Sequence, residues 1–124
     1  MRTPDRRHRR AHAITQALRY QLDACCAAGH VDAMVVADGD GLPIASSGDA
    51  YACDEVAARM VIAGRRIDAF DGTLLGSGQH WDVTMQKLRV EDTELLVCAV
   101  GGTAEARARQ LVRGAAGALR ILAA

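Results

Sequence analysis

The run Asp38-Gly-Asp-Gly41 places two carboxylates at a spacing that suggests a calcium-binding loop. An EF-hand loop also needs a third oxygen ligand at its fifth position and a glutamate at its twelfth. The fifth position here is Leu42 and the twelfth is Asp49. Asp-Gly pairs tolerate the positive φ angles of tight hairpin turns. The run therefore predicts a turn between two strands rather than a calcium site.

The run Val100-Gly-Gly-Thr103 has the outline of an anion site, because glycines lead into an expected helix start. It lacks the lysine of a P-loop and the full glycine spacing of a dinucleotide-binding turn. The pattern is therefore typical of an ordinary strand-to-helix connection.

No serine or cysteine has a base placed beside it by the sequence. Ser46, Ser47 and Ser77 lie outside any nucleophile-elbow pattern. His30 and His80 have no second histidine three or four residues away, as a helical zinc site needs. We therefore expect a non-enzyme with no catalytic residues, no bound metal and no cofactor.

The cysteines lack the CxxC spacing of metal sites, and no export signal precedes them; they are Cys25, Cys26, Cys53 and Cys98. We expect them to be reduced, core-filling residues of a cytoplasmic protein. No apolar run approaches the ~18–20 residues of a membrane helix, so we expect no membrane insertion.

The composition predicts one globular domain, because half of the 124 residues are apolar and 3% are aromatic. The net charge of zero is a cancellation between segments. Residues 1–31 carry six Arg and two Asp, residues 32–94 carry five basic and twelve acidic residues, and residues 95–124 carry four Arg and one Glu. The basic residues are not interleaved with aromatics, so we expect no nucleic-acid binding.

Five of the first ten residues are arginine, which predicts a solvated basic tail over residues 1–11, ahead of a single domain over 12–124. A contact between this tail and an acidic partner or an anionic surface is the alternative.

Apolar residues at helical spacing predict helices over 12–28, 50–66 and 104–122. Strands are predicted over 31–37, 42–46, 79–90 and 94–100. The glycine-rich segment 68–78 is either a further short strand or a loop. Apolar residues change phase after Gln86, which predicts a bulge or strand break there. The result is an α+β domain with a mainly antiparallel sheet of four to five strands, in the order α-β-β-α-β-β-β-α.

Local signals add detail at the helices. Gly29 is expected to end the first helix in a left-handed conformation, and Asp49 and Thr103 are expected to cap the other two. The last helix has one expected buried stripe, made of Ala108, Leu111, Val112, Ala115, Leu119 and Leu122. The second helix has two apolar stripes, one with Cys53, Val56, Met60, Ala63 and Ile67 and one with Ala57, Val61 and Gly64.

The run from Gly29 to Gly48, GHVDAMVVADGDGLPIASSG, resembles the first hairpin of the Roadblock/dynein-light-chain domain family. The later elements agree with that family in order, so the resemblance covers about residues 12–122. It implies a five-stranded antiparallel sheet with one helix on one face and two on the other. It also implies a noncatalytic scaffold that dimerises through its second helices and sheet edges. Bacterial members commonly regulate Ras-like small GTPases.

The two apolar stripes of the second helix fit this resemblance if one covers the sheet and the other meets a partner. We therefore predict a homodimer that binds or regulates a Ras-like small GTPase, with an interface at Val56, Met60, Gly64, Ile67 and Trp81. The first alternative is that the helix residues are intrachain core. The second is a small-molecule-sensing domain of similar α+β type, which would need a sizeable internal pocket.

Overall fold

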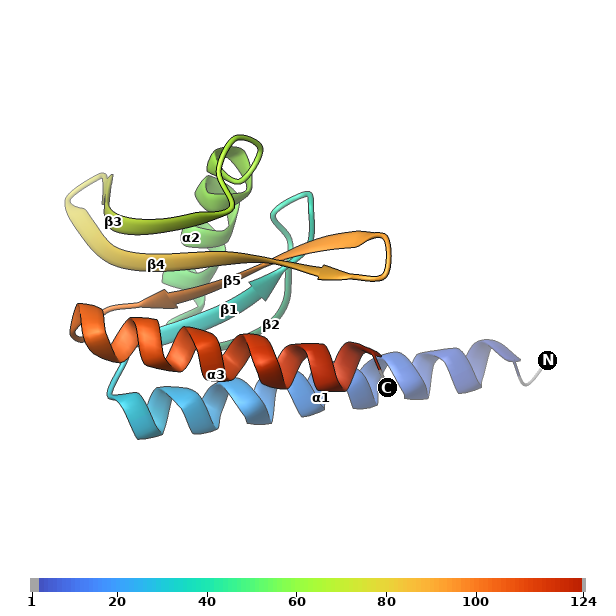
Figure 1. Cartoon of the computed structure of the whole chain (residues 1–124). Coiled ribbons are helices and arrows are strands. Elements are labelled where there is room, and N and C mark those ends of the chain that lie inside the picture. The colour runs from blue at the N-terminus through green and yellow to red at the C-terminus, as the bar shows by residue number, and fades with distance from the viewer. Residues whose placement is uncertain (1–2, 124) are drawn as a thin grey trace.

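The order of the elements matches the predicted order in a computed structural model, which describes residues 3–123 and the side chains from Arg9 onward. Figure 1 shows these elements, which are α1 (Thr3–Gly29), β1 (Ala33–Ala37), β2 (Pro43–Gly48), α2 (Ala50–Ala63), β3 (Ala69–Gly76), β4 (Gln79–Val90), β5 (Thr93–Val100) and α3 (Ala104–Ala123).

The five strands form one antiparallel sheet in the order β2-β1-β5-β4-β3. Helices α1 and α3 lie side by side on one face, and α2 lies on the other (Figure 1). The predicted fold is therefore confirmed, including the third strand that the glycine-rich segment left open. Strand β3 pairs with β4 from Ala69 to Gly76.

Helix α1 begins at Thr3 rather than near residue 12, so the basic segment continues the helix. Arginine is a good helix former, and Pro4 lies in the first turn, where its missing N–H costs no hydrogen bond. The N-terminal part of α1 extends past the end of α3 (Figure 1). Residues 1 and 2 of the predicted tail lie outside the described residues.

The predicted turn at Asp38 is confirmed. Its Oδ1 accepts hydrogen bonds from the backbone N–H groups of Asp40 at 2.9 Å and Leu42 at 3.0 Å. Gly41 has a φ of 82°, which glycine adopts without strain. This carboxylate therefore stabilises the hairpin between β1 and β2.

Two of the three predicted helix-end roles are confirmed. Asp49 caps α2 by accepting from the N–H of Ala52 at 2.9 Å, and Thr103 accepts from the N–H of Ala106 at 3.0 Å at the start of α3. The prediction for Gly29 is wrong, because His30 holds the left-handed conformation, with a φ of 53°. A Cβ at Gly29 would lie 2.3 Å from Cγ of Gln110, so this glycine serves the contact between α1 and α3.

Strand β4 is continuous, so the predicted bulge or break after Gln86 is wrong. The buried side of the strand changes instead. Val83 and Met85 face the core beneath α2, whereas Leu88 and Val90 face the core beneath α1 and α3. Helix α2 ends at Ala63 and does not cover the sheet near Leu88 and Val90. The apolar residues of this part of β4 therefore lie on the opposite face of the sheet, beneath α1 and α3.

The buried face of α3 differs from the predicted stripe. Ala108 and Val112 are exposed, and Leu119 is 37% exposed. Leu111 and Ala115 of the predicted stripe are buried, and the rest of the buried face is Arg107, Gln110, Gly114, Gly117 and Ala118. The glycines let α1 and α3 approach closely, since a Cβ at Gly117 would meet the side chain of Gln21. Apolar periodicity therefore identified Leu111 and Ala115 but missed the polar and glycine positions of this face.

All four cysteines are free thiols, as predicted. Cys25, Cys53 and Cys98 are buried, and Cys26 is half-buried. Burial raises the pKa of Cys53 to about 11 and that of Cys98 to about 12. These thiols therefore stay protonated and unreactive near neutral pH.

Candidate protein-interaction surface

Helix α2 carries a row of exposed and half-buried side chains on the flank nearest β3 and β4. Tyr51, Glu55, Arg59 and Ile62 recur at helical spacing, and we call them the α2 outer stripe. Tyr51 is 55% exposed and Ile62 is 62% exposed. The opposite side of the helix faces the sheet with Ala52, Cys53, Val56, Ala57 and Met60. The helix therefore fills the core with one face and carries on the other a stripe with two exposed apolar or aromatic residues and one ion pair.

Trp81 on β4 joins the α2 outer stripe to the sheet. Its ring lies 6.1 Å from the ring of Tyr51, and the Arg59 guanidinium lies 5.7 Å from its centroid. A Cβ at Gly76 would lie 2.9 Å from the indole, so only glycine leaves room for this ring at the end of β3. Tryptophan, tyrosine and arginine are the side chains that most often carry binding energy at protein interfaces.

Arg59 is held in place by three groups. Its guanidinium donates to the carbonyl oxygen of Leu75 on β3, stacks near Trp81 and lies 3.7 Å from the carboxylate of Glu55. These contacts connect α2 to the edge strand. Arg59 is thus held in place before any partner binds, which lowers the entropic cost of association at this residue.

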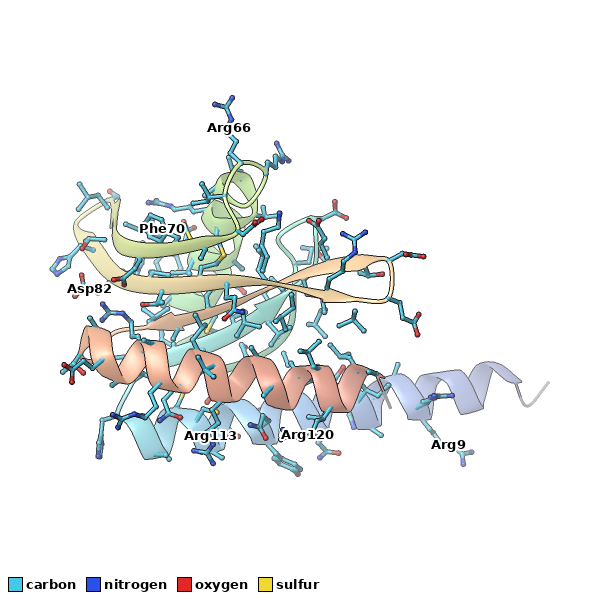
Figure 2. All side chains as sticks on the ribbon, in the orientation of Figure 1. Arg9, Arg66, Phe70, Asp82, Arg113 and Arg120 are labelled. Atoms are coloured by element: carbon cyan, nitrogen blue, oxygen red, sulfur yellow. The ribbon has the colours of Figure 1, made fainter. Side chains whose placement is uncertain are left out.

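Strand β3 is the sheet edge beside this stripe. Among the described strands it has β4 as its single neighbour, so its other edge is unpaired in this chain. Side chains alternate along it, with Phe70 and Leu74 packed into the core beneath α2. Figure 2 shows Phe70 on this edge strand. An unpaired edge strand offers a row of backbone donors and acceptors to a second chain.

The structure separates the five predicted interface residues. Val56 and Met60 are 0% and 2% exposed and pack in the core beneath α2, so they have no surface to offer a partner. Gly64 is buried at the end of α2, where a Cβ would lie 3.3 Å from Cδ2 of Leu96. Ile67 is 40% exposed, and Trp81 is half-buried beside the stripe.

The second predicted stripe of α2 is also covered within the chain. Ala57 is buried, and Val61 packs against the hairpin turn, since a Cβ at Gly41 would lie 2.9 Å from its Cγ1. Ala57 and Val61 therefore have little surface to offer a partner in the single chain. Tyr51, Arg59 and Ile62 lie on a third stripe of α2. Ile62 could have indicated this stripe from the sequence, because it belongs to neither predicted apolar stripe.

The loop with Gly101 and Gly102 holds the chain's own arginine. The Arg107 guanidinium donates to the carbonyl oxygens of Gly101 at 3.1 Å and Gly102 at 3.0 Å. Carbonyl oxygens of this loop therefore face a cation rather than an anion, as expected for an ordinary strand-to-helix connection.

Among the described residues, no three His, Cys, Asp or Glu side chains come together as metal ligands. None of the described helices has the length and apolar character needed to cross a membrane.

Two of the hollows on the described part of the chain are relevant to a small-molecule site, and both are open to solvent. One of about 300 Å³ lies at the end of α2, where the Lys87 ammonium is paired with Glu94 at 3.2 Å. The other, of about 390 Å³, lies between α1 and the edge strand β2. A small-molecule site usually encloses most of its ligand, which neither hollow does.

Comparison with protein-family models gave no match, and comparison with curated protein sequences gave none either. Solved structures do match over most of the chain. MglB of Myxococcus xanthus aligns with a TM-score of 0.59 at 9% identity, over 86% of this chain and 88% of the other. A structure described as MglB with a tetrameric arrangement aligns at 0.64 and 13% identity, over 89% and 90%.

The gliding protein MglB of Thermus thermophilus aligns with a TM-score of 0.61 at 13% identity, over 89% of this chain and 91% of the other. At these identities the likeness concerns the fold. These matches agree with the strand order and helix placement expected for this fold. The chain therefore has the Roadblock-type fold, shared with MglB, that its first hairpin indicated.

Proposed function

We propose that this chain is a noncatalytic, dimeric regulator of a Ras-like small GTPase. The observation that carries the proposal is the α2 outer stripe, which lies with Trp81 beside the unpaired edge of β3. The first hairpin resembles those of Roadblock domains, and this resemblance is the reason for proposing a Ras-like small GTPase as the partner. The fold shared with MglB structures supports the same assignment.

The dimer would form when two β3 edges pair and two α2 helices meet. Ile62 and Tyr51 supply exposed apolar area on α2, and each fully buried side chain of this size contributes roughly 1.5–3 kcal/mol. Strand pairing would satisfy the backbone groups of β3. Arg59 and Trp81 lie between these two elements, at the place where interface energy is usually concentrated.

Light scattering on two matched variants tests the dimer. Ile62→Glu places a charge in the α2 outer stripe and should convert the dimer to a monomer. Val112→Glu is the control, because Val112 on α3 is 65% exposed, close to the 62% of Ile62, but lies on the other face of the sheet. A wild-type monomer at tens of micromolar, or equal dissociation of both variants, would contradict the proposed interface.

Pull-down with a Ras-like GTPase from the same organism tests the partner. We expect the wild-type chain to retain the GTPase loaded with one nucleotide, GDP or a nonhydrolysable GTP analogue, more strongly than with the other. The Ile62→Glu variant should retain less of it, and Val112→Glu should behave like the wild type. Absence of binding in both nucleotide states would overturn the GTPase assignment and leave the dimer to stand on the light-scattering result.

A further inference from the structure

The outward side of the α1–α3 layer carries a row of arginines. On α3, Arg109, Arg113 and Arg120 recur at intervals of four and seven residues, which places them on one stripe. All three are exposed, and the opposite stripe of the helix, with Leu111 and Ala115, is buried. Figure 2 shows Arg113 and Arg120 on the side of the layer turned away from the sheet. The row spans about 16 Å along the helix.

Helix α1 adds to the same side. Arg9 is exposed on the part of α1 that extends past α3, and it lies on the same side of the layer in Figure 2. Tyr20 is 62% exposed, and its hydroxyl accepts a hydrogen bond from Gln16 at 3.0 Å. Tyr20 lies eleven residues after Arg9, close to three helical turns, so both project from one stripe. We call Arg9, Tyr20, Arg109, Arg113 and Arg120 the basic helix face.

These arginines form no ion pair with any side chain that the structure describes. Among the residues whose side chains are described, Arg9, Arg109, Arg113 and Arg120 form no salt bridge, whereas Arg59, Arg89 and Arg107 do. The described acidic residues on α1 and α3 are Asp23, which accepts from the Ser47 hydroxyl on β2, and Glu105 in the first turn of α3. Most other acidic residues lie between residues 32 and 94. The charge of a neutral chain is therefore separated by layer.

We propose that the basic helix face docks peripherally on an anionic membrane surface. Charge complementarity to acidic lipid headgroups identifies the class of partner, and the shape of the layer favours a membrane. Helices α1 and α3 lie side by side, so a flat surface can contact the outward stripes of both helices at once (Figure 1). A DNA duplex is a convex cylinder and would meet one helix at a time. Tyr20 supplies the amphipathic ring that suits the headgroup region.

Docking of this kind needs no insertion. Each basic residue near an anionic bilayer strengthens binding by roughly fivefold, so the four arginines together support reversible adsorption rather than permanent anchoring. The dimer proposed above would strengthen it. Pairing of two β3 edges about a two-fold axis perpendicular to the sheet places both basic helix faces on the same side, so both could contact one membrane. The docking itself requires a single chain.

Flotation of the full chain with lipid vesicles tests this proposal. One set of vesicles is phosphatidylcholine alone, and the other replaces about a third of it with phosphatidylserine. We expect binding to the anionic vesicles only. The variant Arg109→Gln/Arg113→Gln/Arg120→Gln should bind them on the order of a hundredfold more weakly. All three positions are exposed, so the urea midpoint of the variant should match that of the wild type.

A control variant removes the same charge elsewhere. Arg65→Gln/Arg66→Gln/Arg89→Gln changes three exposed arginines on other elements, and Arg66 lies far from the α1–α3 layer in Figure 2. It should bind anionic vesicles within about twofold of the wild type, because charges farther than a Debye length of about 8 Å are screened. A loss equal to that of the first variant would show that net charge, not this face, governs binding.

Two further measurements complete the test. Wild-type binding should fall steeply as salt rises from about 0.05 to 0.5 M, which checks the electrostatic origin without any variant. Mixed-sequence duplex DNA is then added at a phosphate concentration equal to that of the anionic lipid. The chain should stay with the vesicles. Displacement by the DNA, or no binding to phosphatidylserine vesicles at low salt, would overturn the membrane assignment.

Discussion

The guanidinium of Arg107 on α3 lies 3.7 Å from the carboxylate of Asp71 on β3. Thr84 on β4 joins the two, because it accepts from Nε of Arg107 at 3.1 Å and donates to Asp71 at 2.8 Å. Arg107 is buried, with 7% of its side chain exposed, whereas Asp71 is 61% exposed. This chain of contacts fixes α3 to the edge strand through which we propose that the dimer forms.

Replacement of Arg107 by methionine should lower the free energy of unfolding by about 2–4 kcal/mol. The carbonyls of Gly101 and Gly102 would lose their donor in a half-buried setting. Arg109→Met is the matched control, since Arg109 is exposed two residues further along the same helix, and it should stay within about 0.5 kcal/mol of the wild type. Urea unfolding followed by circular dichroism measures both. Equal stability of the two variants would refute a structural role for Arg107.

Gly48→Ala should be strongly destabilising. Gly48 has a φ of 94°, and an added Cβ would lie 2.3 Å from the carbonyl oxygen of Asp32. Strain and clash together should cost about 2 kcal/mol or more. Gly39→Ala serves as the comparison, because nothing lies within 4 Å of the added atom. Thermal unfolding should show a large drop in Tm for the first variant and little change for the second; similar Tm values would contradict this explanation.

Alkaline pH should destabilise the fold through its buried thiols. Burial raises the pKa of Cys98 to about 12 and that of Cys53 to about 11, from an ordinary value of 9.0. Above pH 9 the unfolded chain releases these protons while the folded chain keeps them. The free energy of unfolding therefore falls as pH rises from 9 toward 11 for Cys53 and toward 12 for Cys98, and this contribution is fully present below pH 9.

Urea unfolding at pH 8 and pH 10 measures that loss. For Cys98→Ala the decline between the two pH values should be shallower by up to about 1.4 kcal/mol per pH unit. Val97→Ala also truncates a buried residue of β5 but removes no thiol, so its decline should parallel that of the wild type. A decline that is unchanged in Cys98→Ala would show that other groups govern the alkaline loss.

Most of the fold could be predicted because its signals are local. The Asp38 turn, the caps at Asp49 and Thr103, and the buried run of β5 each depend on residues that are neighbours in the chain. These signals, with the hairpin motif, predicted the order of the elements and left only β3 undecided between a strand and a loop. The sequence could not decide whether β3 is a strand or a loop, because its glycines suggest a loop. At least one of them serves packing instead, since a Cβ at Gly76 would meet the Trp81 ring.

The errors arose where packing between distant segments decides the outcome. The helical stripes of α2 could not show that the hairpin turn covers Val61, or that the sheet buries Val56 and Met60. Leu111 and Ala115 on the buried face of α3 were predicted, but Arg107, Gln110 and the two glycines of that face were missed because they carry no apolar signal. Trp81 was predicted as an interface anchor and lies beside the exposed stripe, but its partners Tyr51 and Arg59 come from a separate element.

The solution mass of the chain at tens of micromolar tests the central claim most directly, because the proposed function depends on two α2 outer stripes meeting. Multi-angle light scattering should give twice the chain mass of 13.2 kDa for the wild type and for Val112→Glu. Ile62→Glu should give the mass of one chain. A wild-type mass of one chain, or an Ile62→Glu variant that keeps the doubled mass, would contradict the proposed interface.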